Sequence, residues 1–243
     1  MKTNTKILIP GGTGFIGYHL CKFFINKRWM VHSVSKSKPK KNRRVKGVKY
    51  IYCDVCNKDE LKKKLDVYYD YIINLSGYVD HSKNKSITRT HYLGCKNLVK
   101  NFKKNIPIKF IQVGSSIEYG KLKSPQKEVF IKKINTSSTY GDAKLASTLF
   151  LLSQYKKNSF PVSIIRTYLV YGPNQDFNRV IPFVINKTLT GSTFDCSPGN
   201  QLRDFLFIED FVKAVDKSLK SNKNIGEVIN IGFGKPIKIK SLI

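Results

Sequence analysis

The segment Lys6-Ile-Leu-Ile-Pro-Gly-Gly-Thr-Gly-Phe-Ile-Gly17 decides the fold of this chain. An apolar run, Lys6–Pro10, passes directly into a glycine-rich turn, and helical periodicity begins at Phe15. Gly11 permits a sharp turn, Gly14 lets backbone amides approach an anion, and Gly17 lets a helix pack closely on the strand. The first turn of that helix offers N–H groups and the positive end of a dipole to phosphate. The segment therefore predicts a strand, a phosphate-binding turn and a helix.

The same alternation of short apolar runs and amphipathic stretches continues along the chain. The expected strands are Lys6–Pro10, Met30–Ser35, Val48–Cys53, Tyr71–Leu75, Ile108–Val113 and Val162–Arg166. The expected helices between them are Phe15–Asn26, Lys58–Leu65, Ile87–Lys104 and Thr139–Lys156. Strands that are apolar throughout are typical of a parallel sheet covered on both faces. This α/β pattern predicts a doubly wound, parallel Rossmann sheet of six strands.

The rhythm changes after Tyr171, where glycine and proline turn signals interrupt the chain more often. Two further helices are expected there, Val180–Leu189 and Glu209–Lys220. We therefore expect a dinucleotide-binding Rossmann domain over residues 1–171. Residues 172–243 would form a small C-terminal substrate-binding lobe over the carboxyl edge of the sheet, interleaved with it.

Composition restricts the function classes. The formal net charge is +28, with 44 Lys and Arg against 16 Asp and Glu, but lysines are spread over the predicted surface helices. Because no nucleic-acid-binding module is recognisable, specific nucleic-acid binding ranks last. The basic run Lys36–Lys49 is expected to be a solvated loop. The five cysteines lack zinc-site spacing, so no metal site is predicted. No apolar stretch reaches membrane-spanning length, and the protein is expected to be cytoplasmic and not bound to membranes.

Several motifs together resemble one family. Gly11, Gly14 and Gly17 follow the spacing GxxGxxG. In order, they are followed by Asn74-Leu-Ser-Gly77, Gly114-Ser-Ser-Ile-Glu-Tyr-Gly120, Tyr140-Gly-Asp-Ala-Lys144, Arg166-Thr-Tyr-Leu-Val-Tyr-Gly-Pro173 and Arg203-Asp-Phe-Leu-Phe-Ile-Glu-Asp210. The chain resembles the extended short-chain dehydrogenase/reductase family, which contains nucleotide-sugar epimerases, dehydratases and reductases. The resemblance covers nearly the whole chain. Relatives usually continue beyond this point, so either the lobe is reduced or the sequence is truncated.

Tyr140 and Lys144 are the first candidate catalytic residues. Four residues apart in a predicted helix, they share one face. A tyrosine hydroxyl normally titrates at about pH 10, and a neighbouring ammonium favours its ionised form. A surface Tyr–Lys pair is common, but this one follows a strand and the Ser115-Ser116 segment at a suitable distance. The resemblance implies that Lys144 also holds the nicotinamide ribose.

Ser115 aligns with the catalytic Ser/Thr of the family, which implies a hydrogen bond to the reacting sugar oxygen. Ser116 beside it is a candidate substrate-binding residue, and a local turn or cap is the alternative role for either serine. Dehydratases of the family carry an Asp-Glu pair directly after that Ser/Thr. Here Ser116 and Ile117 occupy those positions, and Glu118 lies one place too far along. Dehydration is therefore disfavoured, which leaves epimerisation or ketone reduction.

The expected cofactor-binding residues are Gly11, Gly14, Phe15, Ile16, Gly17, Ser35, Lys36, Asp54, Val55, Leu75, Ser76, Gly77, Tyr140 and Lys144. NAD-selective sites usually place a carboxylate at the end of the second strand. Here the second strand ends in Ser35-Lys36, and no carboxylate follows before Asp54. Because hydroxyl and ammonium groups suit a 2′-phosphate, the sequence favours NADP over NAD. The resemblance places Asp54 near the adenine, with a helix cap as the alternative.

Arg203 and Arg179 are the candidate substrate-binding arginines. The resemblance implies that Arg203 faces the substrate diphosphate, and Arg179 lies in the same lobe. A guanidinium fork suits phosphate oxygens. Each arginine could instead pair with a nearby carboxylate, Asp204 or Asp176. The family usually has asparagine at the positions of His91 and Leu169. We assign His91 no role in proton transfer, and Leu169 leaves the identity of the sugar open.

The sequence therefore predicts an NAD(P)-dependent nucleotide-sugar epimerase or ketoreductase that uses Ser115, Tyr140 and Lys144. The alternative is a non-catalytic Rossmann module that binds the dinucleotide as a sensor or assembly component. By analogy with the family, a homodimer would form through paired helices, for which residues 87–104 and 139–156 are the candidates.

Overall fold

A seven-stranded parallel sheet forms the centre of the molecule. The computed structural model describes residues 5–77, 84–128, 136 and 138–243. The strand order is β10-β6-β5-β4-β1-β2-β3, and every pairing is parallel. The strands are β1 Lys6–Pro10, β2 Met30–Ser35, β3 Lys49–Tyr52, β4 Tyr71–Asn74, β5 Lys109–Ser115, β6 Val162–Thr167 and β10 Val228–Ile231. The predicted doubly wound Rossmann sheet is confirmed.

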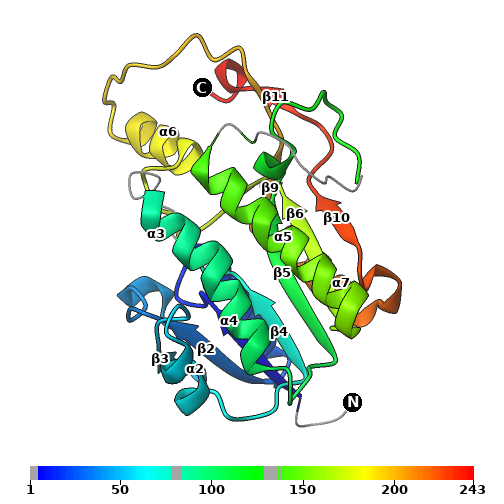
Figure 1. Cartoon of the computed structure of the whole chain (residues 1–243). Helices are drawn as coiled ribbons and strands as arrows, with labels where there is room; N and C mark the ends of the chain where they lie inside the picture. The colour runs from blue at the N-terminus through cyan, green and yellow to red at the C-terminus, as the bar shows by residue number, and fades with distance from the viewer. Residues whose placement is uncertain (1–4, 78–83, 129–135, 137) are drawn as a thin grey trace.

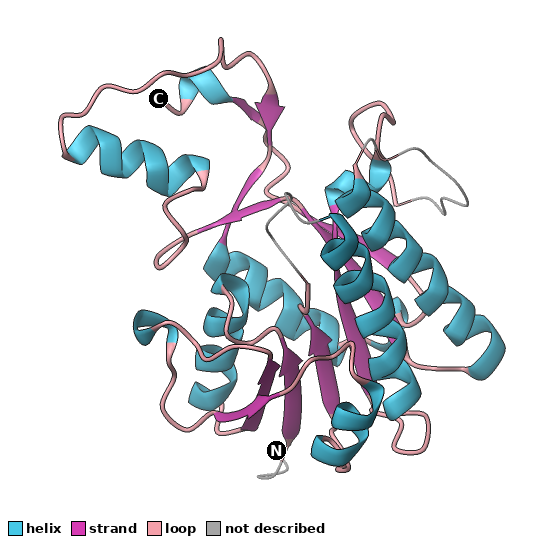
Figure 2. Cartoon of the chain, turned by 60° about the vertical axis from the view of Figure 1, so that its left-hand side comes forward, coloured by secondary structure: helices cyan, strands magenta, loops and turns pink. Residues whose placement is uncertain are grey.

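Helices cover both faces of this sheet (Figures 1 and 2). On one face lie α1 Phe15–Asn26 and α7 Ile208–Lys220, and on the other α2 Lys58–Lys64, α4 Gly94–Asn101 and α5 Thr139–Asn158. Strand β1 shows why its sequence is apolar throughout. Ile7 and Ile9 pack with the α1 and α7 layer, Leu8 packs with the α2, α4 and α5 layer, and all three are fully buried.

The helix expected over residues 87–104 is interrupted. It consists of α3 Asn84–Thr88, a π-helical turn Arg89–Leu93, and α4, which ends at Asn101. His91 lies in the π turn and is buried, and its main-chain oxygen accepts a hydrogen bond from Ser147 of α5 at 3.0 Å. Single π turns inside helices change the direction of side chains and are frequent at functional sites.

The C-terminal part leaves the sheet and then returns to it. Helix α6 Val180–Leu189 lies apart from the sheet, together with an antiparallel pair, β8 Leu202–Arg203 and β11 Ile237–Lys238 (Figures 1 and 2). A parallel pair, β7 Leu169–Tyr171 and β9 Phe205–Phe207, connects this lobe to the sheet. Helix α7 then packs on α1, and β10 pairs with β6 as the seventh strand. The proposed division at residue 171 stays a prediction, since the later segment contributes to both parts.

The basic run at residues 36–49 is not simply a solvated loop. Its 3₁₀ turn Lys41–Arg43 and the preceding Lys40 contact Asn174 and Asp176. Arg43 Nη2 lies 2.6 Å from the main-chain oxygen of Asn174 and 3.1 Å from the carboxylate of Asp176. Lys40 pairs with the same carboxylate at 2.6 Å. The side chain of Arg43 is only 6% exposed, so part of the charge expected at the surface instead joins two distant segments.

The described residues contain neither a membrane-spanning helix nor a metal-binding cluster. None of the helices in these ranges is long and apolar enough to cross a membrane. No group of three or more His, Cys, Asp or Glu side chains there could hold a metal ion.

Candidate active site

The glycine turn lies where the order of the sheet reverses. From β1 the chain proceeds through β2 and β3 on one side, whereas β4, β5 and β6 lie on the other. Gly11 follows β1 and Leu75 follows β4, and the two meet so closely that a Cβ on Gly11 would lie 2.7 Å from the main-chain oxygen of Leu75. Open α/β sheets bind ligands at such a switch point, outside the carboxyl ends of the strands.

Close backbone contacts explain the glycines of this turn. Gly11 has φ +83° and donates its N–H to Val34 O at 2.7 Å. A Cβ on Gly17 would lie 2.4 Å from Gly11 O, and one on Gly12 would lie 2.4 Å from Ser33 Oγ. Gly14 is exposed and begins α1 without a side-chain cap. The uncapped first turn, which includes Phe15 and Ile16, therefore presents its N–H groups at the switch point.

The ends of β2 and β3 place the expected adenosine-binding residues together. Ser35 Oγ donates to Val34 O at 2.7 Å, and Lys36 Nζ lies 3.8 Å from the carboxylate of Asp54. Asp54 also accepts the N–H of Cys56 at 2.9 Å, but the cap of the following helix α2 is Asn57 and not Asp54, so the alternative role of Asp54 as a helix cap is wrong. The side chain of Val55 is buried in the core, so only its backbone is available to a ligand.

Two cysteines flank Asp54 and Val55. Burial raises the pKa of Cys53 to about 11, and burial together with the Asp54 charge raises that of Cys56. Neither environment favours a thiolate, so the Cys53–Cys56 pair has the character of packing residues.

The segment after β4 is held by buried polar groups. The N–H and the hydroxyl of Ser76 both donate to Asn74 Oδ1, at 3.0 and 2.6 Å, and Asn74 Nδ2 donates to Gln112 Oε1 at 2.7 Å. Gly77 leaves no room for a side chain, because a Cβ there would lie 1.8 Å from His91 Cε1. The segment Leu75 to Gly77 is therefore held in place between the glycine turn and the π turn.

Tyr140 and Lys144 lie in the first turns of α5. Ser138 caps this helix through a hydrogen bond from the N–H of Gly141 at 3.0 Å. The rings of Tyr140 and His91 meet edge to face with centroids 5.1 Å apart. Lys144 Nζ lies 5.8 Å from the centroid of the Tyr140 ring and donates to Val113 O at 2.8 Å. A lysine ammonium has three donors, so this bond leaves capacity for a ligand.

Ser115 ends β5 and caps the 3₁₀ turn Ser116–Tyr119, which contains Ser116 as its first residue. Its hydroxyl oxygen accepts the N–H of Ile117 at 3.4 Å, and the Glu118 carboxylate accepts the N–H of Ser115 at 2.9 Å. The cap uses the Ser115 hydroxyl as an acceptor, so its proton can still be donated to a ligand. Sheet order places Ser115 on the same side of the switch point as α5.

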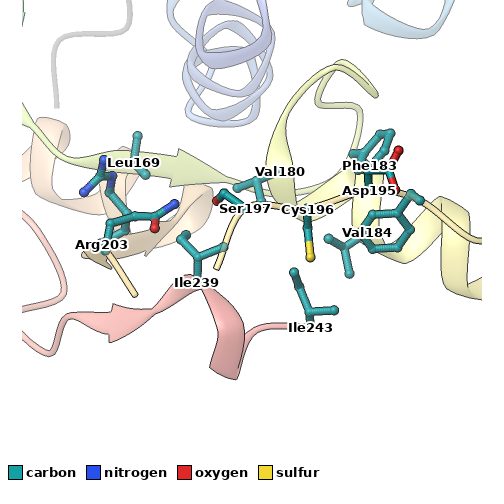
Figure 3. A pocket seen from close by; sticks show the side chains of 12 residues that line it. Leu169, Val180, Phe183, Val184, Asp195, Cys196, Ser197, Arg203, Ile239 and Ile243 are labelled. Carbon is teal, nitrogen blue, oxygen red and sulfur yellow. The ribbon is translucent and has the colours of Figure 1, made fainter. Parts of the chain in front are cut away.

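The lobe contains a cavity of about 310 Å³ (Figure 3). Its wall is mainly apolar and is formed by Leu169, Val180, Phe183, Val184, Phe194 and Ile239 together with Ile243. Polar groups come from Arg203, Asp195, Cys196, Ser197 and Gln201. Arg203 lies in this wall, whereas Arg179, which precedes α6, does not. Of the two candidate substrate-binding arginines, the structure therefore places Arg203 at the cavity and not Arg179.

This arrangement defines a Rossmann-type domain with a candidate ligand site at its switch point. The chain belongs to the NAD dependent epimerase/dehydratase family, which matches residues 7–232. It is 30% identical to the dTDP-D-glucose 4,6-dehydratase of Dictyostelium discoideum, over 93% of this chain but only 58% of that protein. The chain therefore spans little more than half of this relative.

Solved structures give the same fold. The UDP-N-acetylglucosamine 4-epimerase of Methanobrevibacter ruminantium is 26% identical, with a TM-score of 0.85 over 98% of this chain and 80% of that one. The dTDP-glucose 4,6-dehydratase of Bacillus anthracis, solved with NAD, has a TM-score of 0.84 at 22% identity, over 98% of this chain and 78% of that one.

Several buried polar residues at the site were not predicted. Gln112 accepts from Asn74, Glu118 accepts from Ser115, and Arg166 pairs with Glu118 at 3.0 Å. For Gln112 in β5 and Arg166 in β6, a polar residue within an otherwise apolar strand was the available signal, because buried polar side chains require partners. Their partners, however, come from other elements.

Proposed function

We propose that this protein is an NAD-dependent enzyme that moves a hydride to or from a carbon of a nucleotide-activated sugar, as an epimerase or a ketoreductase. One observation carries the proposal. The switch point brings an uncapped helix N-terminus with its glycine turn to the same sheet edge as Ser115 and the Tyr140–Lys144 helix. Family membership and the enzymes to which the chain is similar support it.

The residues present fit a dinucleotide. A side chain at Gly11 or Gly17 would fill the space of the turn, and the first turn of α1 can hold a pyrophosphate. The adenosine half of the dinucleotide would be held by Ser35, Lys36 and Asp54. The remainder of the dinucleotide would lie over the segment Leu75 to Gly77. The dinucleotide, when bound, supplies the hydride acceptor or donor.

We infer NAD rather than the NADP that Ser35 and Lys36 suggested. The comparisons give no support for NADP, and the B. anthracis relative was solved with NAD. Within this chain, the Lys36–Asp54 pair brings a carboxylate to the end of β2, where it can accept from ribose hydroxyls and would repel a 2′-phosphate.

The three candidate catalytic residues have distinct roles in this proposal. Tyr140 takes the proton of the sugar hydroxyl during oxidation and returns it during reduction. Lys144 stabilises the ionised tyrosine and binds the nicotinamide ribose through the donors that Val113 O leaves available. Ser115 donates to the sugar oxygen, whose charge changes as the hydride moves.

The geometry does not favour dehydration. Elimination of water needs an acid and a base beside the sugar, and Ser116 and Ile117 supply neither. Glu118 does not replace them, because it is fully buried and paired with Arg166. Although a curated relative is named as a dehydratase, we propose a reaction limited to hydride and proton transfer.

The lobe cavity would bind the nucleotide part of the substrate. Apolar walls suit a base, and Arg203 at the wall suits a diphosphate. Ser116 would contact the sugar. We assign Arg179 no direct contact with this cavity.

The experiment combines binding with turnover. Titration with NADH and NADPH, followed by nicotinamide fluorescence, should show tighter binding of NADH. Incubation with UDP- and dTDP-linked hexoses should then reveal cofactor reduction or an epimerised product. Tyr140→Phe should lower kcat by roughly 10²- to 10⁴-fold. Tyr68→Phe, the same change at an exposed tyrosine before β4, is the matched control and should retain activity.

Full turnover by Tyr140→Phe would contradict the proposal. Dinucleotide binding without turnover of any sugar would instead favour the non-catalytic Rossmann module.

We also propose a homodimer formed through α4 and α5. Both helices lie on one outer face of the sheet (Figure 1). Leu93, directly before α4, and Tyr155 of α5 are 38% and 37% exposed. Light scattering should give twice the 27.8 kDa mass of the chain. A monomer at micromolar concentration would contradict this assembly.

A further inference from the structure

Glu118 is at the centre of a buried network beneath the candidate active site. One carboxylate oxygen accepts the N–H of Ser115 at 2.9 Å. The other accepts Thr148 Oγ1 at 2.8 Å and Arg166 Nε at 3.0 Å. Glu118 is fully buried, and Thr148 and Arg166 are each 1% exposed. The guanidinium of Arg166 also lies 4.5 Å from the centroid of the Tyr119 ring.

These bonds join the elements that carry the candidate catalytic residues. Ser115 ends β5. Arg166 belongs to β6, where it pairs with Gly114 of β5. Thr148 is four residues beyond Lys144 and eight beyond Tyr140, so the three side chains share one face of α5. Glu118 is therefore bonded to the strand that ends in Ser115 and to the helix that carries Tyr140 and Lys144.

The network is poorly explained by stability alone. A well-packed apolar residue can replace a buried ion pair without loss of stability, because burial of two charges carries a large desolvation cost. Arg166 Nη1 is buried and has no hydrogen-bond partner in the described part of the chain, so the ion pair is not fully satisfied. The backbone also accommodates Glu118, since a Cβ on Gly114 would lie 2.4 Å from its Oε1.

We propose that Glu118 is a positioning residue that fixes Ser115 relative to Tyr140 and Lys144, an inference that rests on the proposed function of those three residues. The carboxylate provides what an apolar side chain does not. One of its oxygens accepts from the backbone of Ser115, and the other accepts from Thr148 of α5. The rigid carboxylate group therefore sets the distance between Ser115 and α5.

Glu118→Gln removes the acceptor of the Ser115 N–H, and it also removes the charge that faces Arg166. Glutamine keeps the size of the side chain but replaces one acceptor oxygen with a donor NH₂ group. Arg166 Nε and Thr148 Oγ1 both donate to the same carboxylate oxygen, Oε2. In the glutamine variant the amide oxygen therefore takes the place of Oε2. The NH₂ group then faces the N–H of Ser115, which loses its acceptor. Thr148→Val removes the bond to α5 and leaves the Ser115 bond in place.

The experiment has two readouts. The first is hydrogen–deuterium exchange in peptides that cover residues 114–119. Glu118→Gln should accelerate exchange there by about 10-fold relative to wild type, since the Ser115 amide loses its acceptor. The second is turnover of UDP- and dTDP-linked hexoses. For both variants kcat should fall by about 10-fold, with KM within about twofold, because positioning acts on contacts made in the transition state.

Lys109→Met is the control for a structural effect alone. Lys109 is buried at the amino end of β5, away from the site, where Nζ donates to Ser218 O and to Asn224 Oδ1. This variant should lower thermal stability but leave exchange at residues 114–119 and kcat unchanged.

Unchanged exchange in Glu118→Gln would overturn the inference, whether or not wild type turns over any sugar. Faster exchange with unchanged kcat would overturn it also, because the position of Ser115 would then not matter. Inactivity of wild type on every sugar would refute the proposed function separately, and exchange would still decide whether Glu118 fixes Ser115.

Discussion

The sheet and the C-terminal lobe use apolar residues in opposite ways. In the sheet, Ile7, Ile72 and Ile164 are fully buried between two helix layers. In the lobe, Leu189 is 83% exposed and Leu202 is 55% exposed. The sheet is therefore a rigid frame, whereas the lobe leaves large apolar side chains exposed and forms a cavity that is open to solvent. The three candidate catalytic residues lie on the frame, and Arg203, which we propose for substrate binding, lies in the lobe.

Glycine substitutions should give the largest difference between the two regions. A Cβ on Gly17 would lie 2.4 Å from Gly11 O and 2.5 Å from Gly12 Cα, so backbone must move. Gly17→Ala should cost about 3 kcal/mol of unfolding free energy and prevent NADH binding. Gly191→Ala in the lobe meets no atom within 4 Å and is strained only by its φ of +61°, which costs about 1 kcal/mol. Urea unfolding and NADH titration measure both effects.

Equal losses of stability from these two variants would mean that the glycine turn yields as readily as the lobe. The rigid-frame interpretation would then be wrong.

The pH dependence of stability should come partly from the sheet. Burial, with the nearby charges of Lys49 and Lys6, lowers the pKa of His32 to about 4 from the ordinary 6.5. Between these values the unfolded state binds a proton that the folded state does not. Stability from this group is therefore complete above pH 6.5 and is lost as the pH falls towards 4, by about 2 to 3 kcal/mol.

His32→Asn should remove this dependence, because asparagine does not titrate. The amide oxygen can still accept a hydrogen bond from Tyr69 OH, which lies 2.8 Å from His32 Nδ1. Urea unfolding at intervals from pH 4 to 7 gives the difference between variant and wild type. Parallel curves for the two proteins would show that His32 does not titrate differently on unfolding.

Substitution of the lobe arginine should affect binding and leave stability nearly unchanged. Arg203 is exposed, and its Nη1 donates to Leu202 O at 2.8 Å. Arg203→Ala should weaken UDP binding by about 10-fold, or about 1.4 kcal/mol. Unfolding free energy should change by no more than about 0.5 kcal/mol. Calorimetric titration with UDP measures the first effect, and urea unfolding the second.

Arg179→Ala is the matched control, because Arg179 does not line the cavity. If both variants bind UDP equally, the cavity is not the nucleotide site.

The elements that the sequence predicts best are those with local signals. Four elements have the expected boundaries: Lys6–Pro10, Met30–Ser35, Phe15–Asn26 and Val180–Leu189. At the end of each of them, the apolar run or helical period stops at a glycine or a polar residue. Strands β7 to β11 have two to four residues each and no measurable period, so they were not predicted. The π turn at residues 89–93 was missed because a helical pattern does not show one inserted residue.

The site divides in the same way. The glycine turn and the Tyr140–Lys144 spacing are local, and both could be recognised. Glu118 is paired with Arg166, 48 positions later, and only the fold brings them together. Arg43 was expected in solvent, yet Asn174 and Asp176 surround it from more than 130 positions away.

The return of the chain from the lobe to the sheet has a consequence for the covalent backbone. Strand β10 pairs with β6 through residues 228–231, and α7 packs on α1, so the lobe is anchored at both ends. A protease that cuts the exposed segment near Gly191 would separate the chain into two fragments, yet the later one would still hold a strand and a helix of the frame. The nicked molecule would stay assembled as a noncovalent pair, and its two pieces would part only on denaturation.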